Sequence, residues 1–163
     1  MFSYDIQALA RRVVEEASAR GVAVACAESC TGGLVAGAIT AVPGSSAALD
    51  RGFVTYGNAA KAEMLGVPPQ LIEGHGAVSE AVARAMAEGA LRASGAGAAA
   101  AVTGFAGPAG PDDEPGLVHF AVAALGAPTR HEEHHFGDVG RGPVRLECLR
   151  VALRMIEQAV TNR

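Results

Sequence analysis

The sequence has no tryptophan and only 4% aromatic residues, although half of its 163 residues are hydrophobic and 21 are glycine. Its core must therefore be built mainly from alanine and small aliphatic side chains. The chain also lacks an apolar run of the roughly 18–20 residues that cross a membrane, and its first residues lack a signal-peptide layout. We expect one cytoplasmic domain, residues 1–163, with no membrane partner.

Excess basic charge is also missing, because the net charge is −4, so nucleic acid is not an expected partner. The cysteines Cys26, Cys30 and Cys148 are odd in number and lack metal-site spacing, which favours a reduced, metal-free protein. Lysine is nearly absent: of 13 basic residues, only Lys61 is not arginine. A buried lysine can act as a base, whereas arginine cannot, so Lys61 either carries chemistry or lies on a solvated helix.

Helix-like and strand-like segments alternate along the chain. We predict a helix that stops at Gly21, helices over 34–42 and 59–65, a helix capped by Ser79, and a final helix from about Val144. Strand-like stretches cover residues 22–27, 53–56, 97–102, 117–125 and 129–136. Continuous apolar strands between helices favour an α/β layered domain.

The stretch AESCTGG, residues 27–33, lies between a predicted strand and a predicted helix. Ser29 would lie at the carboxyl end of that strand, where open α/β sheets bind ligands. The N–H groups of Thr31, Gly32 and Gly33 would face outward at a helix N-terminus and could bind a phosphate or an oxyanion. Cys30 is a competing nucleophile without a histidine base nearby in sequence, and simple helix capping also explains the pattern.

Tyr56 and Lys61 are separated by four residues at the junction of a predicted strand and helix, so both can reach one cleft. A desolvated lysine activates the serine of Ser–Lys hydrolases, and a tyrosine hydroxyl could relay a proton or orient the lysine. The alternative is a core tyrosine beside a surface lysine.

Two further clusters attract attention in the C-terminal part. Residues 131–135, HEEHH, contain the zinc motif H-E-x-x-H, which requires a helix. Pro128 and Gly137 bound this stretch without helical periodicity, so we expect a solvated edge strand instead. Arg141 and Arg145, four residues apart, could hold a phosphate or carboxylate, or be ordinary surface arginines.

Several stretches together resemble the CinA C-terminal domain family, the nicotinamide-nucleotide amidohydrolases. They are AESCTGG (27–33), VPGSSAALDRGFVTYGNAAKAEMLGV (42–67), HGAVSEAVARAMAEGAL (75–91), VTGFAGPAG (102–110) and GRGPVR (140–145). The resemblance implies a single three-layer α/β/α domain with a mixed, largely parallel sheet. It further implies a cofactor-free homodimer that hydrolyses nicotinamide mononucleotide to nicotinate mononucleotide and ammonia.

The same resemblance assigns roles to individual residues. Ser29 would be the nucleophile and Lys61 its base, accompanied by the catalytic hydroxyls of Tyr56 and Thr103. The implied substrate-binding residues are Thr31, Gly32, Gly33, Gly104, Arg141 and Arg145. The sequence departs from the family in a shorter loop over 110–116 and in two extra residues over 137–141. These departures favour an alternative, a weakly catalytic nucleotide-binding or interaction module related to competence or DNA recombination. A third hypothesis is an amidase for another small carboxamide.

Overall fold

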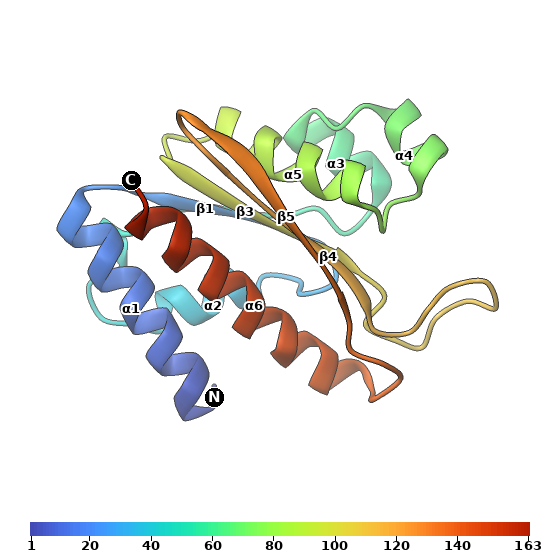
Figure 1. Cartoon of the computed structure of the whole chain (residues 1–163), viewed down its shortest axis with the longest axis horizontal. Helices are drawn as coiled ribbons and strands as arrows, with labels where there is room; N and C mark the ends of the chain where they lie inside the picture. The colour runs from blue at the N-terminus through green and yellow to red at the C-terminus, as the bar shows by residue number, and fades with distance from the viewer.

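Helices cover both faces of a five-stranded sheet in the computed structural model, which describes residues 1–163 (Figure 1). The strands are β1 (Val24–Glu28), β2 (Leu49–Val54), β3 (Ala98–Gly104), β4 (Leu117–Ala124) and β5 (Ala127–His135), in the order β2-β1-β3-β4-β5. The pairings of β1 with β2 and β3 are parallel, whereas β3–β4 and β4–β5 are antiparallel. The predicted mixed sheet in a single α/β domain is confirmed.

The helices form two layers. One layer holds α1 (Tyr4–Arg20), α2 (Leu34–Thr40) and α6 (Arg141–Thr161), with α1 and α6 packed against each other (Figure 1). The other holds α3 (Asn58–Leu65), α4 (Pro69–His75) and α5 (Glu80–Arg92). A short 3₁₀ turn, Ser45–Ala47, precedes β2. No helix combines the length and the apolar character that crossing a membrane would require.

Alternate residues of the central strands supply two separate cores. The first lies under α1, α2 and α6 and includes Cys26 and Val102, while the second lies under α5 and includes Ala27 and Ala101. This alternation is the ordinary consequence of the two-residue period of a strand. The predominance of alanine keeps the second core thin and brings the helices close to the sheet.

The contact between α3 and α5 depends on a glycine. A Cβ atom at Gly89 of α5 would collide with the carbonyl oxygen of Leu65, the last residue of α3. The small-residue contact therefore sets how closely α3 approaches α5. Because Lys61 is part of α3, this packing also sets where its side chain reaches the sheet.

Most elements lie within a few residues of their predicted positions, with three differences. Helix α4 was not predicted, because it has seven residues and buries only Ile72, which leaves no periodic pattern to detect. Strand β2 begins at Leu49 and ends at Val54, so Tyr56 lies in the loop after the strand. Helix α6 begins at Arg141 rather than near Val144.

Candidate functional site

Ser29 lies immediately after β1, at the carboxyl end of the parallel strands. Its N–H donates to the carbonyl oxygen of Val102 over 3.0 Å, and the preceding carbonyl, of Glu28, accepts from Thr55 N–H over 2.9 Å. Both neighbouring strands therefore hold the backbone at this point. Gly32 and Gly33 follow with φ angles of +57° and +100°, the left-handed region that glycine tolerates best. They turn the chain directly into α2.

The side chain of Lys61 contacts Ser29 from α3, which belongs to the helical layer on the other side of the sheet from α2. Its Nζ lies 3.2 Å from Ser29 Oγ, 2.9 Å from the carbonyl oxygen of Thr55 and 3.3 Å from that of Tyr56. The lysine is only 1% exposed and no carboxylate pairs with it, and burial lowers its pKa below the ordinary value. A neutral amine placed here can donate its two N–H groups to the carbonyls and accept the Ser29 hydroxyl proton.

Ser29 opens onto a cavity of about 230 Å³. The lining residues come from the ends of β1 and β3, the loop after β2 and the start of α6: Ser29, Cys30, Tyr56, Gly104, Phe105, Ala106, Gly107, Pro108 and Arg141. The backbone N–H groups of Cys30, Ala106 and Gly107 donate no hydrogen bond within the chain. The cavity therefore combines an activated hydroxyl with unused backbone donors, which is what acyl transfer needs.

Arg141 spans this cavity. Its Nη2 donates to the Tyr56 hydroxyl over 2.6 Å, and its Nη1 donates to the carbonyl oxygen of Gly107 over 3.0 Å. The Tyr56 hydroxyl thus contacts the arginine, while only the Tyr56 backbone carbonyl contacts Lys61. One guanidinium joins the loop after β2 to the loop after β3 and places a permanent positive charge beside Ser29.

Arg145 lies one helical turn further along α6 and does not line the cavity. Its Nη2 donates to the carbonyl oxygen of Thr31 over 3.1 Å, and the guanidinium packs against Gly32. Arg145 therefore supports the turn after Ser29 from outside.

Thr103 is buried in β3, and its hydroxyl donates to the carbonyl oxygen of Ala77 over 2.8 Å. This bond ties β3 to the segment between α4 and α5. Among the two residues predicted at the end of β3, Gly104 lines the cavity and Thr103 does not.

The segment 31–33 differs from the expected outward-facing helix N-terminus. Helix α2 begins at Leu34, and Gly32 N–H donates to the carbonyl oxygen of Ser29 over 3.0 Å. The N–H of Leu34, the first residue of the helix, donates to the carbonyl oxygen of Thr31 over 3.1 Å, and the next two, those of Val35 and Ala36, donate to the carboxylate of Glu28 over 2.8 and 3.1 Å. The Glu28 carboxylate therefore binds the first turn of α2, whereas the N–H groups of Thr31 and Gly33 donate no hydrogen bond within the chain. Sequence reasoning gave Glu28 no role, although an acidic residue shortly before an apolar helix is a capping signal.

Cys30, the competing nucleophile, is 4% exposed and packs in the first core together with Cys148. Contact with the Cys148 thiol lowers the pKa of Cys30, and the same contact raises the pKa of Cys148. No histidine forms a hydrogen bond with Cys30. The geometry around Cys30 thus lacks the base that a thiol nucleophile ordinarily uses.

The histidine-rich stretch forms edge strand β5, as predicted. Because side chains alternate along a strand, His131 faces α5 and contacts His119 over 2.9 Å, while His134 contacts Glu132 over 2.7 Å on the other face. The two histidines of H-E-x-x-H are His131 and His135, which lie on the same face of the strand; His135 contacts Glu114 over 2.6 Å and Glu133 over 2.7 Å. No group of three histidine, cysteine or acidic side chains has an arrangement that could hold a metal ion.

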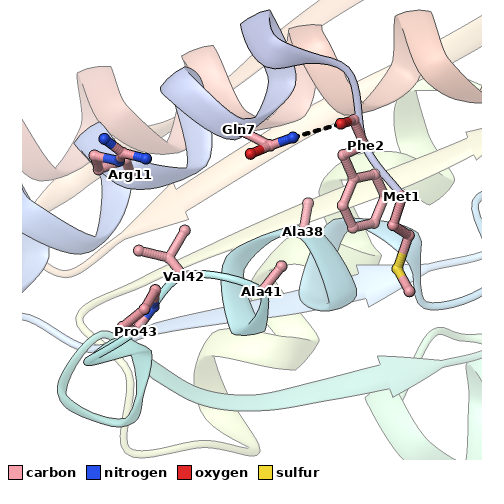
Figure 2. A pocket seen from close by; sticks show the side chains of 8 residues that line it. All are labelled: Met1, Phe2, Gln7, Arg11, Ala38, Ala41, Val42 and Pro43. Carbon is pink, nitrogen blue, oxygen red and sulfur yellow. Dashed lines mark hydrogen bonds between the residues drawn. The ribbon is translucent and has the colours of Figure 1, made fainter.

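A second cavity of about 230 Å³ lies between α1 and the end of α2 (Figure 2). Figure 2 shows that apolar side chains line most of it, with Gln7 donating to the carbonyl oxygen of Phe2 over 2.6 Å. Arg11 is its only charged side chain, and no hydroxyl, thiol, imidazole or carboxylate faces it. The two cavities have similar volumes, so the chemistry of the lining decides between them, and it favours the cavity at Ser29.

Comparison with known proteins gives consistent matches. The model of the family described as "CinA C-terminal domain" matches residues 6–160. A "CinA-like protein" of Anaeromyxobacter dehalogenans is 50% identical over 150 residues, which cover 91% of this chain and 36% of that protein. A "CinA-like protein" of Myxococcus xanthus is 44% identical, with 97% of this chain and 38% of that protein covered. The chain thus spans little more than a third of the length of these curated relatives.

Solved structures match over nearly their whole length. The competence/damage inducible protein CihA from Agrobacterium tumefaciens superposes with a TM-score of 0.95 at 48% identity, covering 99% of this chain and 98% of that one. The competence damage-inducible protein A (ComA) from Klebsiella pneumoniae gives a TM-score of 0.90 at 34% identity, covering 96% and 97%.

Proposed function

The chain belongs to the CinA C-terminal domain family, and we propose that it hydrolyses the carboxamide of nicotinamide mononucleotide to nicotinate mononucleotide and ammonia. The observation that carries the proposal is the 3.2 Å contact between Ser29 Oγ and the buried Lys61 Nζ at the cavity. The resemblance of the motifs to the nicotinamide-nucleotide amidohydrolases supplies the substrate, and the geometry supplies a mechanism suited to it.

In the first half of the reaction, Ser29 Oγ attacks the carboxamide carbon while its proton passes to the neutral Lys61 amine. The carbonyl oxygen becomes an oxyanion, for which the free N–H groups of Cys30, Ala106 and Gly107 are the available donors. Removal of one such donor typically lowers the rate about 10²–10³-fold. Lys61 then returns the proton to the amide nitrogen, the C–N bond breaks, and ammonia leaves.

In the second half, water attacks the ester formed on Ser29. Lys61, neutral again, takes a proton from the water and returns it to Ser29 Oγ as the C–O bond breaks. The products are the carboxylate of nicotinate mononucleotide and the free enzyme. One lysine therefore serves both halves, through its 3.2 Å contact with Ser29 Oγ.

Arg141 is the group that we assign to the anionic part of the substrate. The cavity is smaller than the roughly 300–1,000 Å³ of typical ligand pockets. We infer that the carboxamide end enters toward Ser29 while the phosphate stays at the mouth. There the Arg141 guanidinium can exchange its bonds with Tyr56 and Gly107 for charge-assisted bonds to phosphate oxygens.

The proposal is tested by ammonia release from nicotinamide mononucleotide, measured with the purified chain. We expect the wild-type chain to be active, and Ser29→Ala and Lys61→Arg each to lose at least about 10³-fold in kcat, since both members of the dyad act together. Ser46→Ala, at an exposed serine of the 3₁₀ turn, is the matched control. An inactive wild-type chain would contradict the function, and active Ser29→Ala or Lys61→Arg variants would contradict the mechanism.

One observation favours a second candidate, a module that binds the nucleotide without turning it over. The shortened loop contributes nothing beyond Pro108 to the cavity and projects from the end of the sheet (Figure 1). Saturable binding of the mononucleotide without ammonia release would establish this alternative.

A further inference from the structure

Glu28 and Ser29 are adjacent in sequence but act on opposite faces of the sheet. The Ser29 side chain contacts Lys61 of α3, whereas the Glu28 carboxylate accepts N–H groups of Val35 and Ala36 in α2. Glu28 is 1% exposed, and no arginine or lysine pairs with it. The hydrogen-bond partners of its carboxylate are thus two backbone donors in the first turn of a helix.

Capping a helix with a buried carboxylate is energetically less favourable than capping it with a neutral hydroxyl, unless other interactions compensate. Burial of an ionised group is unfavourable unless hydrogen bonds and a favourable local field compensate it. The same chain caps α5 with the neutral hydroxyl of Ser79, which accepts from Val82 N–H over 3.3 Å. Glu28 instead makes a bond of 2.8 Å to Val35, in keeping with the greater strength of charge-assisted bonds. This position therefore holds its helix more firmly than an ordinary cap would.

The bonds of Glu28 close a ring around the nucleophile. The chain leaves β1 at Glu28, passes through Ser29 and the two positive-φ glycines, and enters α2, where Val35 and Ala36 return to the same carboxylate. The backbone of Glu28 and Ser29 is fixed separately by Thr55 and Val102. The side-chain bonds thus fix the remaining end of the segment that carries Ser29.

We propose that Glu28 is a positioning residue for the nucleophile: its carboxylate holds α2 against the end of β1 and thereby keeps Ser29 Oγ within reach of Lys61 Nζ. Use of hydrolysis as a readout rests on the proposed function, but the positioning of Ser29 can also be measured without that substrate. Misplacement of a reacting group by about 1 Å can lower a rate about 10²-fold.

The test compares Glu28→Gln and Glu28→Asp with the matched control Glu132→Gln. Glu132, on β5 at the far edge of the sheet, is also a hydrogen-bonded carboxylate, but it accepts from Arg154 of α6. In Glu28→Gln, the side chain has one oxygen that can accept a helix N–H, and its NH₂ group faces the second helix N–H, so that two donors meet. In Glu28→Asp, the charge is kept but the side chain is one methylene shorter. Each protein is measured for Tm, for kcat and KM on nicotinamide mononucleotide, and for the pH midpoint of kcat/KM.

A second readout uses a fluorophosphonate, which labels activated serines. Ser29 Oγ bonds to phosphorus, the P–F bond breaks, fluoride leaves, and Lys61 accepts the hydroxyl proton. The labelled residue is identified by mass spectrometry, and the labelling rate is measured well below the Tm of each variant. This rate reports whether the hydroxyl and the amine meet, whatever the natural substrate is.

We expect Glu28→Gln to lower both kcat and the labelling rate by about 10–10²-fold, with KM and the pH midpoint unchanged. Glu28→Asp should fall between Glu28→Gln and the wild type. Glu132→Gln should have a lower Tm than the wild type but the same kcat and the same labelling rate. The proposal is overturned if folded Glu28 variants keep both rates within twofold of the control, or if wild-type Ser29 is not labelled. Normal labelling of the wild type without ammonia release would overturn the proposed function and leave the positioning role standing.

Discussion

Arg141 and Tyr56, 85 positions apart in the chain, meet in a 2.6 Å hydrogen bond between a guanidinium Nη2 and a phenolic hydroxyl. Tyr56 is 60% exposed, so little packing holds its ring, and the bond to Arg141 orients its outer end. The pair lies directly at the cavity that contains Ser29. Both side chains can therefore respond to a bound anion without disturbing the core.

Arg141→Lys should raise the KM for nicotinamide mononucleotide about 10–100-fold with little change in kcat. A lysine keeps the charge but loses the planar pair of donors, and a hydrogen bond to a charged group contributes about 1.5–3 kcal/mol. Initial rates over a range of substrate concentrations measure this. Arg150→Lys, whose guanidinium pairs with Asp5 on the outer surface, is the control and should keep the wild-type KM.

Arg145→Lys should have a different effect, because Arg145 contacts the turn and does not line the cavity. We expect lower kcat and a loss of about 1–3 kcal/mol in the free energy of unfolding, with KM nearly unchanged. Urea denaturation and steady-state kinetics measure the two effects. A rise in KM similar to that of Arg141→Lys would show that Arg145 contacts the substrate instead.

The pH dependence of kcat/KM should rise with pH and level off below pH 10.5, the ordinary lysine pKa. Burial lowers the pKa of Lys61, so the neutral amine that acts as the base forms at a lower pH than it would in water. A profile over pH 6–10 measures the midpoint. Lys61→Arg should abolish the rising limb, since arginine stays protonated, and an unchanged profile in that variant would contradict the assignment.

Acid should destabilise the protein through His119, which is buried between β4, β5 and α5. Burial lowers its pKa, and His131 and His135 act in the same direction, whereas Glu133 and Glu80 oppose the shift. Below pH 6.5 the unfolded chain gains a proton that the folded chain resists, so stability falls as pH decreases. Urea midpoints at pH 7 and pH 5 should therefore differ less in His119→Phe than in the wild type. An equal or larger difference would contradict this account.

Gly89→Ala should reduce the free energy of unfolding by about 1–3 kcal/mol, because the added methyl group meets the Leu65 carbonyl oxygen and α3 must move. Since α3 carries Lys61, kcat should fall as well. Gly74→Ala, where a Cβ atom meets nothing, is the matched control and should keep activity. Thermal denaturation and ammonia release measure the two effects.

Local patterns predict much of this fold because the helices and buried strands carry clear periodicity, and Gly21 and Ser79 mark a helix end and a helix start as expected. The lone lysine suggested a Ser–Lys pair and the family resemblance assigned it to Ser29 and Lys61, but with 32 positions between them no local pattern brings the two side chains together. The bond between Arg141 and Tyr56 and the direction of Arg145 depend on how α6 crosses the sheet, which no local pattern specifies. Glu28 was missed because its backbone partners lie seven and eight residues ahead, further than the three or four residues over which a helix cap is normally recognised.

The side chains of Glu28 and Ser29 point to opposite faces of the sheet, so the site depends on the register of strand β1. A one-residue deletion or insertion within β1 would exchange the two faces, so that the carboxylate would meet the Lys61 amine and the hydroxyl would meet α2. After an insertion, the ammonium would then be neutralised in an ion pair with Glu28; after a deletion, Cys30 would take the position of Ser29. A substitution at Glu28 alters the helix anchor alone, whereas a change in the length of β1 would displace the nucleophile and the helix anchor together.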